Sequence, residues 1–279
     1  MQVEELGTLE TPIALTNTLN VGKVLDAMVE IVIEQCRKDG IEPQSINPVV
    51  GECNDSRINQ IQKRVVGADE VRQAFASASE EFEEGDVGAG AGTICYGLKG
   101  GIGSASRVIR IGEKEYTIGV LVQSNFGATE DFVLNGESVG AKILDWKQEK
   151  DDMAASEEDK GSIMSILATD LPLTSRQLRR ILRRTGVGIA RTGGYTGHGS
   201  GEVMIGFTTA NRIPSGAEEE LLQIQAIPEH VINRAFLAAA EAEQEAILNS
   251  MTAAERTRAQ AGELYYSLSE YLEDQDSKQ

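Results

Sequence analysis

Apolar residues recur at helical spacing in four parts of the chain. The first, 21–37, is the most regular, and Asn20 can cap its start. The third opens with Thr174 and Gln177, whose spacing forms a capping box, and the fourth opens with Pro228 and is rich in alanine. The pattern therefore predicts helices over 21–37, 69–82, 174–192 and 228–251.

Shorter apolar runs between these segments are typical of strands. The region 107–125 reads as a hairpin whose second strand, 116–123, is thoroughly apolar, and Asn135-Gly136 marks the turn of a smaller hairpin. Further strands are predicted over 163–169 and 201–211. Two packed sheets flanked by helices and one mixed sheet both fit this order of elements.

The segments without periodicity are predicted to be mobile. The stretch 147–160 is dominated by charge and has no apolar face, and the acidic tail after Tyr271 is expected to fray. No Pro/Ser-rich linker divides the 279 residues, so the chain is predicted to form a single domain over 1–279.

The overall charge and the cysteines exclude several classes of protein. A formal net charge of −18 repels phosphate backbones and anionic lipids, so neither nucleic acid nor a membrane is an expected partner. No apolar run approaches the ~20 residues of a membrane-spanning helix, and the first residues lack the pattern of a secretory signal. Cys36, Cys53 and Cys95 form no CxxC pair, which favours a reducing compartment, the cytoplasm.

The glycine-rich stretch 85–107 and the two histidines offer little conventional chemistry. A phosphate-binding loop needs a lysine after its glycines, whereas Lys99 precedes the last of them, so close backbone packing around a site is the better interpretation. His198 lies in a glycine-rich loop and His230 in the first turn of a predicted helix, with no HExxH motif. We expect no metal, no cofactor and no histidine-based catalysis.

One peptide bond, Gly161-Ser162, separates charged chain from an apolar strand. An N-terminal serine needs no histidine, because its own α-amine, with a pKa of about 7.7–8.0, can take the hydroxyl proton. That amine exists only after the preceding bond is cut. A small residue before the serine, a loop upstream and a strand downstream suit such a cut, although an ordinary boundary between loop and strand has the same features.

The chain resembles the L-aminopeptidase/D-amidase family, which includes the β-peptidyl aminopeptidases. The resemblance runs in order through "PIALTNTLNVG", "PVVGECND", "GAGAGTICYGLKGGIGSASR", "YTIGVLVQSNFG" and "GSIMSILATDLPL". It implies a four-layer αββα sandwich, similar to N-terminal nucleophile hydrolases and ornithine acetyltransferases. It also implies self-cleavage into 1–161 and 162–279, two chains that stay associated, and a homo-oligomer, by resemblance a tetramer.

The same resemblance assigns the site residues. Ser162 is the expected nucleophile, with its freed amine as the base, and Ser200 and Glu202 match the supporting serine and acid. Their i, i+2 spacing puts both side chains on one face of an extended segment. Asn125 matches an oxyanion-site asparagine, and Tyr96 a tyrosine near the reacting carbonyl.

These features predict a self-processing serine aminopeptidase that acts on short peptides or amino-acid amides through an acyl-enzyme on Ser162. One alternative is acyl transfer to an amine, as in the ornithine acetyltransferases, but those use a threonine nucleophile. Another is an inactive relative, because the N-terminal segment usual in the family ahead of "GTLETPI" is expected to be absent. The sequence does not choose between α-, β- and D-residues as substrates.

Overall fold

A four-stranded sheet forms the centre of the computed structural model, which describes residues 2–150, 161–214 and 221–278. Strands β5 and β6 form an antiparallel hairpin, β9 pairs antiparallel with β6, and β10 pairs parallel with β9. The sheet order is therefore β10-β9-β6-β5. The strand bounds are β5 Ile102–Ile111, β6 Lys114–Asn125, β9 Ser162–Thr169 and β10 Gly201–Thr208.

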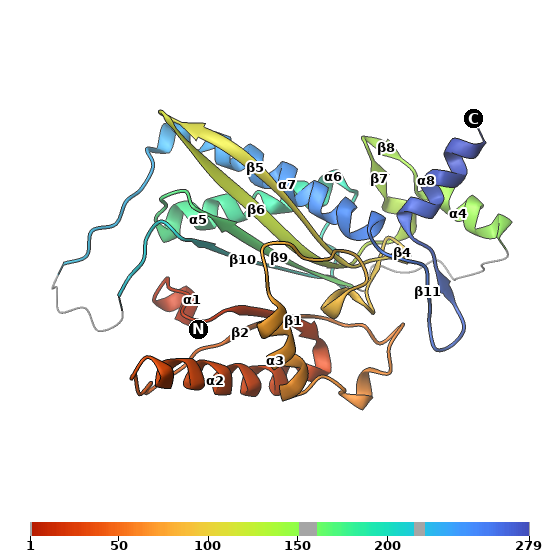
Figure 1. Cartoon of the computed structure of the whole chain (residues 1–279). Helices are drawn as coiled ribbons and strands as arrows, with labels where there is room; N and C mark the ends of the chain where they lie inside the picture. Colours follow the sequence, from red (N-terminus) through yellow and green to blue (C-terminus); the bar gives the residue numbers. More distant parts are fainter. Residues whose placement is uncertain (1, 151–160, 215–220, 279) are drawn as a thin grey trace.

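Three helices cover one face of this sheet (Figure 1). They are α5 Ser175–Leu182, α6 Thr185–Arg191 and α7 Asn233–Thr252. Alternate residues of β6 and β9, such as Val120, Val122, Ile163 and Leu167, are buried in one core with α6 and α7. This alternation is what one buried face of a strand requires, and it confirms the apolar strand predicted over 163–169.

A second, two-stranded sheet packs on the opposite face of the central sheet. Strand β1 (Ile13–Asn17), helix α2 (Val21–Lys38) and strand β2 (Val49–Cys53) form a parallel βαβ unit, and α2 packs with α3 (Ala68–Ser77). The side chain of Met164 in β9 reaches Gly51 in β2, where a Cβ would lie 2.5 Å from the methionine methyl group. The layers are therefore α, β, β, α, which confirms the predicted sandwich (Figure 1).

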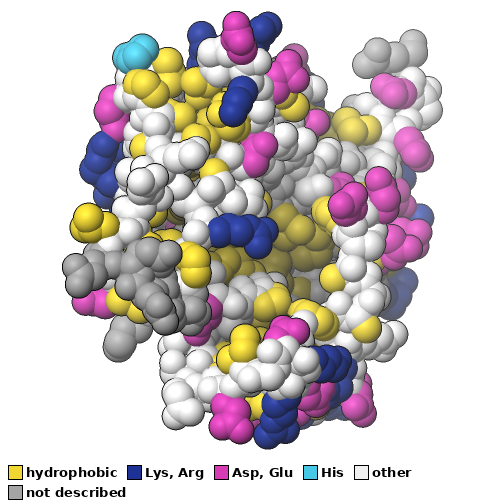
Figure 2. Space-filling model, turned by 60° about the vertical axis from the view of Figure 1, so that its left-hand side comes forward, with side chains coloured by type: hydrophobic (Ala, Val, Ile, Leu, Met, Phe, Trp, Pro, Cys, Tyr) yellow, Lys and Arg dark blue, Asp and Glu magenta, His cyan; other side chains and the backbone are white. Residues whose placement is uncertain are grey.

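The second sheet covers only part of the central one. On the face that points toward β1 and β2, Val108 in β5 and Val203 in β10 remain 64% and 49% exposed. Figure 2 shows hydrophobic side chains on the floor of a hollow between charged groups of both signs. None of the helices in the described ranges is long and apolar enough to cross a membrane.

Short elements complete the chain. The helices are α1 Gln2–Glu5, α4 Gly140–Glu149 and α8 Leu268–Ser277; the strands are β3 Ile94–Cys95, β4 Leu98–Lys99, β7 Val133–Leu134, β8 Glu137–Ser138, β11 Thr257–Arg258 and β12 Leu264–Tyr265. The β7–β8 hairpin confirms the predicted turn, since Asn135 and Gly136 both have positive φ, 52° and 84°.

Several predicted boundaries were wrong. The helix predicted over 69–82 ends at Ser77, and the one predicted from Pro228 begins at Asn233, after a single 3₁₀ turn. The helix predicted over 174–192 is two helices, α5 and α6. The capping box that opens α5 is present, because the side chain of Thr174 accepts from the Gln177 N–H.

Two segments predicted to be mobile contain helix. Residues 147–149 end α4, while 151–160 lie outside the described residues. The tail after Tyr271 continues α8, which a Ser267–Glu270 capping box opens and the buried side chain of Tyr271 anchors. Asn20 also differs from prediction: it makes no side-chain cap, and its amide donates instead to the Asn17 side chain at 2.6 Å.

The glycine-rich stretch packs backbone against backbone, as predicted. A Cβ on Gly101 would lie 2.3 Å from the carbonyl oxygen of Gly85, and one on Gly103 would lie 2.1 Å from the Ala246 carbonyl in α7. Side chains at these positions would force the segments apart. The glycines therefore let the start of β5 approach α7 and the neighbouring loop closely.

A carboxylic acid is buried in the core between α7 and β9. The Ser165 hydroxyl donates to Glu243 Oε1 at 2.5 Å, and Glu243 Oε2 is buried without a partner among the described residues. Burial raises the pKa of Glu243 to about 8, against the opposing effect of the Ser165 hydrogen bond. The folded chain therefore holds this group in its neutral form at pH 7.

Replacement of this acid should change how stability depends on pH. In the unfolded chain the carboxyl ionises near its ordinary pKa of about 4.3, but in the folded chain it does so only near 8. The contribution of Glu243 to the free energy of unfolding is complete below a pH of about 4.3. It is lost as the pH rises from there toward about 8, by up to about 1.4 kcal/mol per pH unit. Glu243→Gln should remove this slope from the free energy of unfolding in urea between pH 5.5 and 8. Equal slopes in both proteins would contradict the assignment.

Candidate active site

Three strand ends meet at one edge of the central sheet. Ser162 is the first residue of β9, and its register partners are Asn125, the last residue of β6, and Gly201, the first of β10. Ser200 and Glu202 flank Gly201 in the chain. The structure thus brings four of the five predicted site residues to the same edge, although they come from three separate segments.

The side chain of Ser162 belongs to the face between the two sheets. It shares that face with Met164, which contacts β2, because strand side chains alternate. Cys53, at the end of β2, places its thiol 3.6 Å from the Ser162 carbonyl oxygen and 3.5 Å from that of Gln123. Ser162 as a whole is half-buried.

Only a glycine fits before Ser162. A Cβ on Gly161 would lie 2.0 Å from the Asn125 carbonyl oxygen and 2.6 Å from the Cα of Phe126. On the other side, the Gly161 carbonyl accepts a hydrogen bond from the Gly201 N–H at 3.0 Å. The peptide before Ser162 is therefore held between β6 and β10.

Ser200 and Glu202 lie at the start of β10 in different environments. The hydroxyl oxygen of Ser200 is buried and has no hydrogen-bond partner among the described residues. Glu202 is half-buried and pairs with Ile163, which puts its side chain on the sheet face opposite to that of Ser162. Any influence of Glu202 on the nucleophile therefore has to pass around the strand end, where Ser200 lies.

The amide of Asn125 is largely engaged. Its Oδ1 accepts from the Ile94 N–H at 3.0 Å, and its Nδ2 donates to the Asn54 carbonyl at 3.1 Å. Because a carboxamide nitrogen carries two hydrogens, one donor direction is left for a substrate oxygen. The side chain is only 8% exposed, so it is held in a fixed orientation.

Tyr96 is placed differently from the other four predicted residues. Its backbone N–H donates to the carbonyl of Phe126, next to Asn125, but its ring is fully buried and stacks on Phe132. The phenol hydroxyl lies 2.9 Å from the Thr192 hydroxyl. The left-handed φ of 51° at Tyr96 turns the side chain into this core.

Sequence reasoning missed Cys53 and the residues that orient Asn125. Burial raises the pKa of the Cys53 thiol to about 12, so it is not a thiolate at neutral pH. The motif "PVVGECND" contains Cys53 and Asn54, but no spacing in it indicates that they meet Ser162 and Asn125. His198 and His230 are both exposed, and no group of His, Cys, Asp and Glu in the described residues could hold a metal ion.

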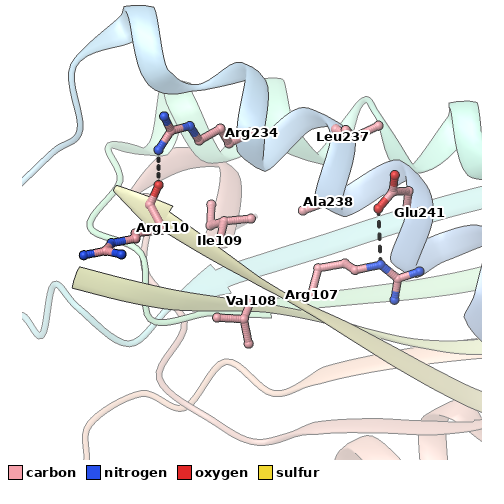
Figure 3. Close-up of a pocket in the computed structure, with 8 residues that line it drawn as sticks. All are labelled: Arg107, Val108, Ile109, Arg110, Arg234, Leu237, Ala238 and Glu241. Carbon is pink, nitrogen blue, oxygen red and sulfur yellow. Dashed lines mark hydrogen bonds and ion pairs between the residues drawn. The ribbon is translucent and has the colours of Figure 1, made fainter. Parts of the chain in front are cut away.

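A surface cavity of about 350 Å³ lies elsewhere, between β5 and α7 (Figure 3). Its cations are engaged: Arg107 pairs with Glu241 at 3.2 Å, and Arg234 donates to the Arg110 carbonyl. Val108 in this cavity is level with Thr117 in β6, which is eight residues or about 26 Å from Asn125. The cavity is therefore separate from the strand ends around Ser162.

Known proteins share both the sequence and the fold. Residues 1–265 match Peptidase family S58. The beta-peptidyl aminopeptidases BapA of Sphingosinicella xenopeptidilytica and Sphingosinicella microcystinivorans are 36% and 35% identical to this chain over 91% of its length. The chain spans 65% of the length of each of these relatives.

Three solved structures superpose on the chain. A protein of Pyrococcus horikoshii OT3 is 44% identical with a TM-score of 0.88, covering 98% of this chain and 74% of that one. A Burkholderia sp. beta-aminopeptidase is 34% identical with a TM-score of 0.85, covering 96% and 73%. The L-aminopeptidase D-Ala-esterase/amidase of Ochrobactrum anthropi, described as a prototype for the serine aminopeptidases and a variant of the Ntn hydrolase fold, is 33% identical with a TM-score of 0.81, covering 91% and 69%. The chain belongs to peptidase family S58.

Proposed function

We propose that the chain is a self-processing serine aminopeptidase that releases N-terminal residues from short peptides or amino-acid amides. The observation that carries the proposal is the position of the peptide Gly161-Ser162. Only glycine fits at its first residue, and it is held between two strands at the edge of the sheet. Membership of family S58 and similarity to aminopeptidases support the same reaction.

The chemistry starts with cleavage of the Gly161–Ser162 bond. The freed α-amine of Ser162 then takes the hydroxyl proton as the hydroxyl attacks the substrate carbonyl. It passes this proton to the leaving amine as the C–N bond of the substrate breaks, and water later hydrolyses the resulting ester. The remaining N–H of the Asn125 side chain stabilises the negative charge on the carbonyl oxygen. This sequence of steps needs no cofactor.

Ser200 and Glu202 support the amine in this proposal. The Ser200 hydroxyl is buried without a partner at the strand end, which suits a group that bonds a newly formed N-terminus. Glu202 lies on the other face of β10 and acts through Ser200. The negative charge of Glu202 strengthens the hydrogen bond between Ser200 and the amine. Tyr96 is assigned to the site less directly, since its phenol bonds Thr192, and we place it as a support for the Asn125 segment.

The two products of cleavage, 1–161 and 162–279, are expected to stay together. Strand β9 pairs with β6 over the full range from Ile118–Thr169 to Asn125–Ser162, and α7 packs on β5 and β6. Their separation would expose the shared core to water, at about 25 cal/mol for each Å² of apolar surface. Association of such pairs into a homo-oligomer is part of the proposal by family resemblance.

Acyl transfer to an amine is the less favoured alternative. A serine stands at the expected nucleophile position instead of the threonine of ornithine acetyltransferases, and the named relatives are aminopeptidases. A comparison of hydrolysis with transfer to an added amine would separate the two reactions. A wild-type chain that remains intact and shows no amidase activity would support an inactive relative instead.

Ser162→Ala should remain a single chain, because the attacking hydroxyl is gone. Wild-type protein should give fragments 1–161 and 162–279 by intact mass, which elute together under native conditions. Ser138→Ala, which replaces an exposed serine in β8, is the matched control and should be cut like the wild type. A wild-type chain that stays whole after long incubation at neutral pH would refute self-processing.

Alkylation should separate Ser162 from the neighbouring thiol as the nucleophile. Since burial raises the pKa of Cys53 to about 12, iodoacetamide at pH 8 should modify the partly exposed Cys36 and leave Cys53 intact until the protein is denatured. Amidase activity should survive this treatment, as judged by peptide mapping and assay of the same sample. Inactivation that tracks modification of Cys53 would assign the attack to the thiol.

Glu202→Gln should lower kcat on the order of 10²-fold or more, because the charge that orders the Ser200–amine pair is lost while the shape is kept. The loss should be measured on mature protein, with an amino-acid amide as substrate. Glu137→Gln, in exposed β8, is the control for loss of one acid and should retain wild-type kcat. A wild-type kcat in Glu202→Gln would remove this residue from the mechanism.

A further inference from the structure

The carbonyl group of Gly161 is the group attacked in self-cleavage, and its oxygen already accepts a hydrogen bond. We propose that the backbone N–H of Gly201 stabilises the negative charge that forms on this oxygen when the chain cleaves itself. The inference rests on the proposed function, since it concerns the cleavage of Gly161–Ser162. It assigns a catalytic task to a backbone group that no motif in the sequence indicates.

The donor is in place before any reaction. The Gly201 nitrogen lies 3.0 Å from the Gly161 oxygen, within the range of a good N–H···O hydrogen bond. Because Gly201 is level with Ser162 in the parallel pairing, this bond is the first of the ladder between β9 and β10. A donor that is fixed by a sheet does not have to reorganise when charge develops on the oxygen. This preorganisation is the main source of the stabilisation that oxyanion donors provide.

On the side of Gly161 that faces β6, the nearest atom is an acceptor. The atom of β6 that faces Gly161 is the carbonyl oxygen of Asn125, since a Cβ on Gly161 would meet it at 2.0 Å. A carbonyl accepts hydrogen bonds and would repel an oxyanion. The scissile peptide is therefore placed between an acceptor on β6 and a donor on β10, and its oxygen points to the donor.

In the uncleaved chain the two hydrogen bonds of the Asn125 side chain go to other groups. Its Nδ2 donates to the Asn54 carbonyl at 3.1 Å, and its Oδ1 accepts from the Ile94 N–H. The hydrogen bond that the structure gives to the Gly161 carbonyl comes from Gly201. We therefore assign Asn125 to the oxyanion of substrate turnover and Gly201 to that of self-cleavage.

The reaction balances with water as the only added reactant. The Ser162 Oγ forms a bond to the Gly161 carbonyl carbon, and the carbonyl π electrons move to the oxygen held by Gly201. The carbonyl then re-forms, the C–N bond breaks, and the Ser162 nitrogen keeps that electron pair and receives the proton lost by the hydroxyl. Water hydrolyses the resulting ester, which leaves a Gly161 carboxylate and a free Ser162 hydroxyl and amine.

The geometry also indicates which substitutions separate the effect of the Gly201 N–H from other effects. A Cβ on Gly201 would meet the Ser162 Cβ at 3.9 Å, an ordinary contact, so Gly201→Ala keeps the donor without crowding. Gly201→Pro removes the N–H. Val203 lies two residues further along β10 and pairs with Met164, so Val203→Pro removes the next N–H of the ladder toward β9 and leaves the Gly161 carbonyl untouched.

The test is the rate of self-cleavage in the full chain, followed by intact mass after expression. Gly201→Pro should slow cleavage on the order of 10²-fold or more, the loss typical of one oxyanion donor, while the conservative Gly201→Ala should stay within about tenfold of the wild type. Val203→Pro controls for the general effect of proline in β10 and should slow cleavage far less than Gly201→Pro. Equal rates for Gly201→Pro and Gly201→Ala, or equal slowing by both prolines, would overturn the assignment.

A second measurement covers the case in which the proline variants do not fold. In full-length Ser162→Ala with labelled glycine, the Gly201 amide should exchange slowly with water and show a scalar coupling to the Gly161 carbonyl carbon. Rapid exchange without coupling would overturn the inference. If the wild type does not cleave itself, the proposed function fails as well, whereas cleavage of Gly201→Pro at the wild-type rate defeats the Gly201 assignment alone.

Discussion

The pairing of β6 with β9 is the interaction on which the rest of the site depends. Its register sets Asn125 opposite Ser162 and thereby presses the Asn125 carbonyl against Gly161. A slip of one residue would turn Ser162 toward the helices and bring Ile163 out between the sheets. The burial of Ile163 and Leu167 opposes that slip, because each large apolar side chain contributes about 1.5–3 kcal/mol when buried. The apolar pattern of β9 therefore fixes where its first residue lies.

Beside this pairing, a buried lysine holds the glycine-rich segment together. The ammonium of Lys99 donates to the carbonyls of Gly90, Thr93 and Gly100 at 2.8, 3.1 and 2.7 Å. Burial lowers the pKa of Lys99 to about 8, and the charge of Asp86 opposes this only in part. The lysine therefore supplies hydrogen bonds to buried backbone carbonyls in a segment whose glycines have no side chains to do so. The β3–β4 hairpin gains a fixed position next to the end of β6, where Asn125 lies.

Local patterns in the sequence predicted the main elements, while contacts between distant segments decided the orientation of the site. The Thr174–Gln177 capping box needs only three residues of spacing, and it forms as predicted. The spacing of Ser200 and Glu202 indicates a shared face but not which face, because that depends on pairing with β9. Tyr96 gives no local sign that its hydroxyl meets Thr192, 96 residues away. A motif matched to a known family therefore identifies the site residues but not the directions in which their side chains point.

The proposed cut adds an amine to the site without releasing the strand that carries it. A free N-terminus is ordinarily mobile, but Ser162 begins an inner strand that β6 and β10 hold on both sides. Residues from both sides of the cut also share one core. The ring of Trp146, from the first part, packs edge-on against Tyr266 and Tyr271 of the second, with ring centroids 5.0 and 5.4 Å apart. The position of Ser162 then depends on sheet pairing and burial, and not on the covalent bond before it. A strand start between two neighbours is therefore suited to a proposed nucleophile whose α-amine base is freed only when its own peptide bond is broken.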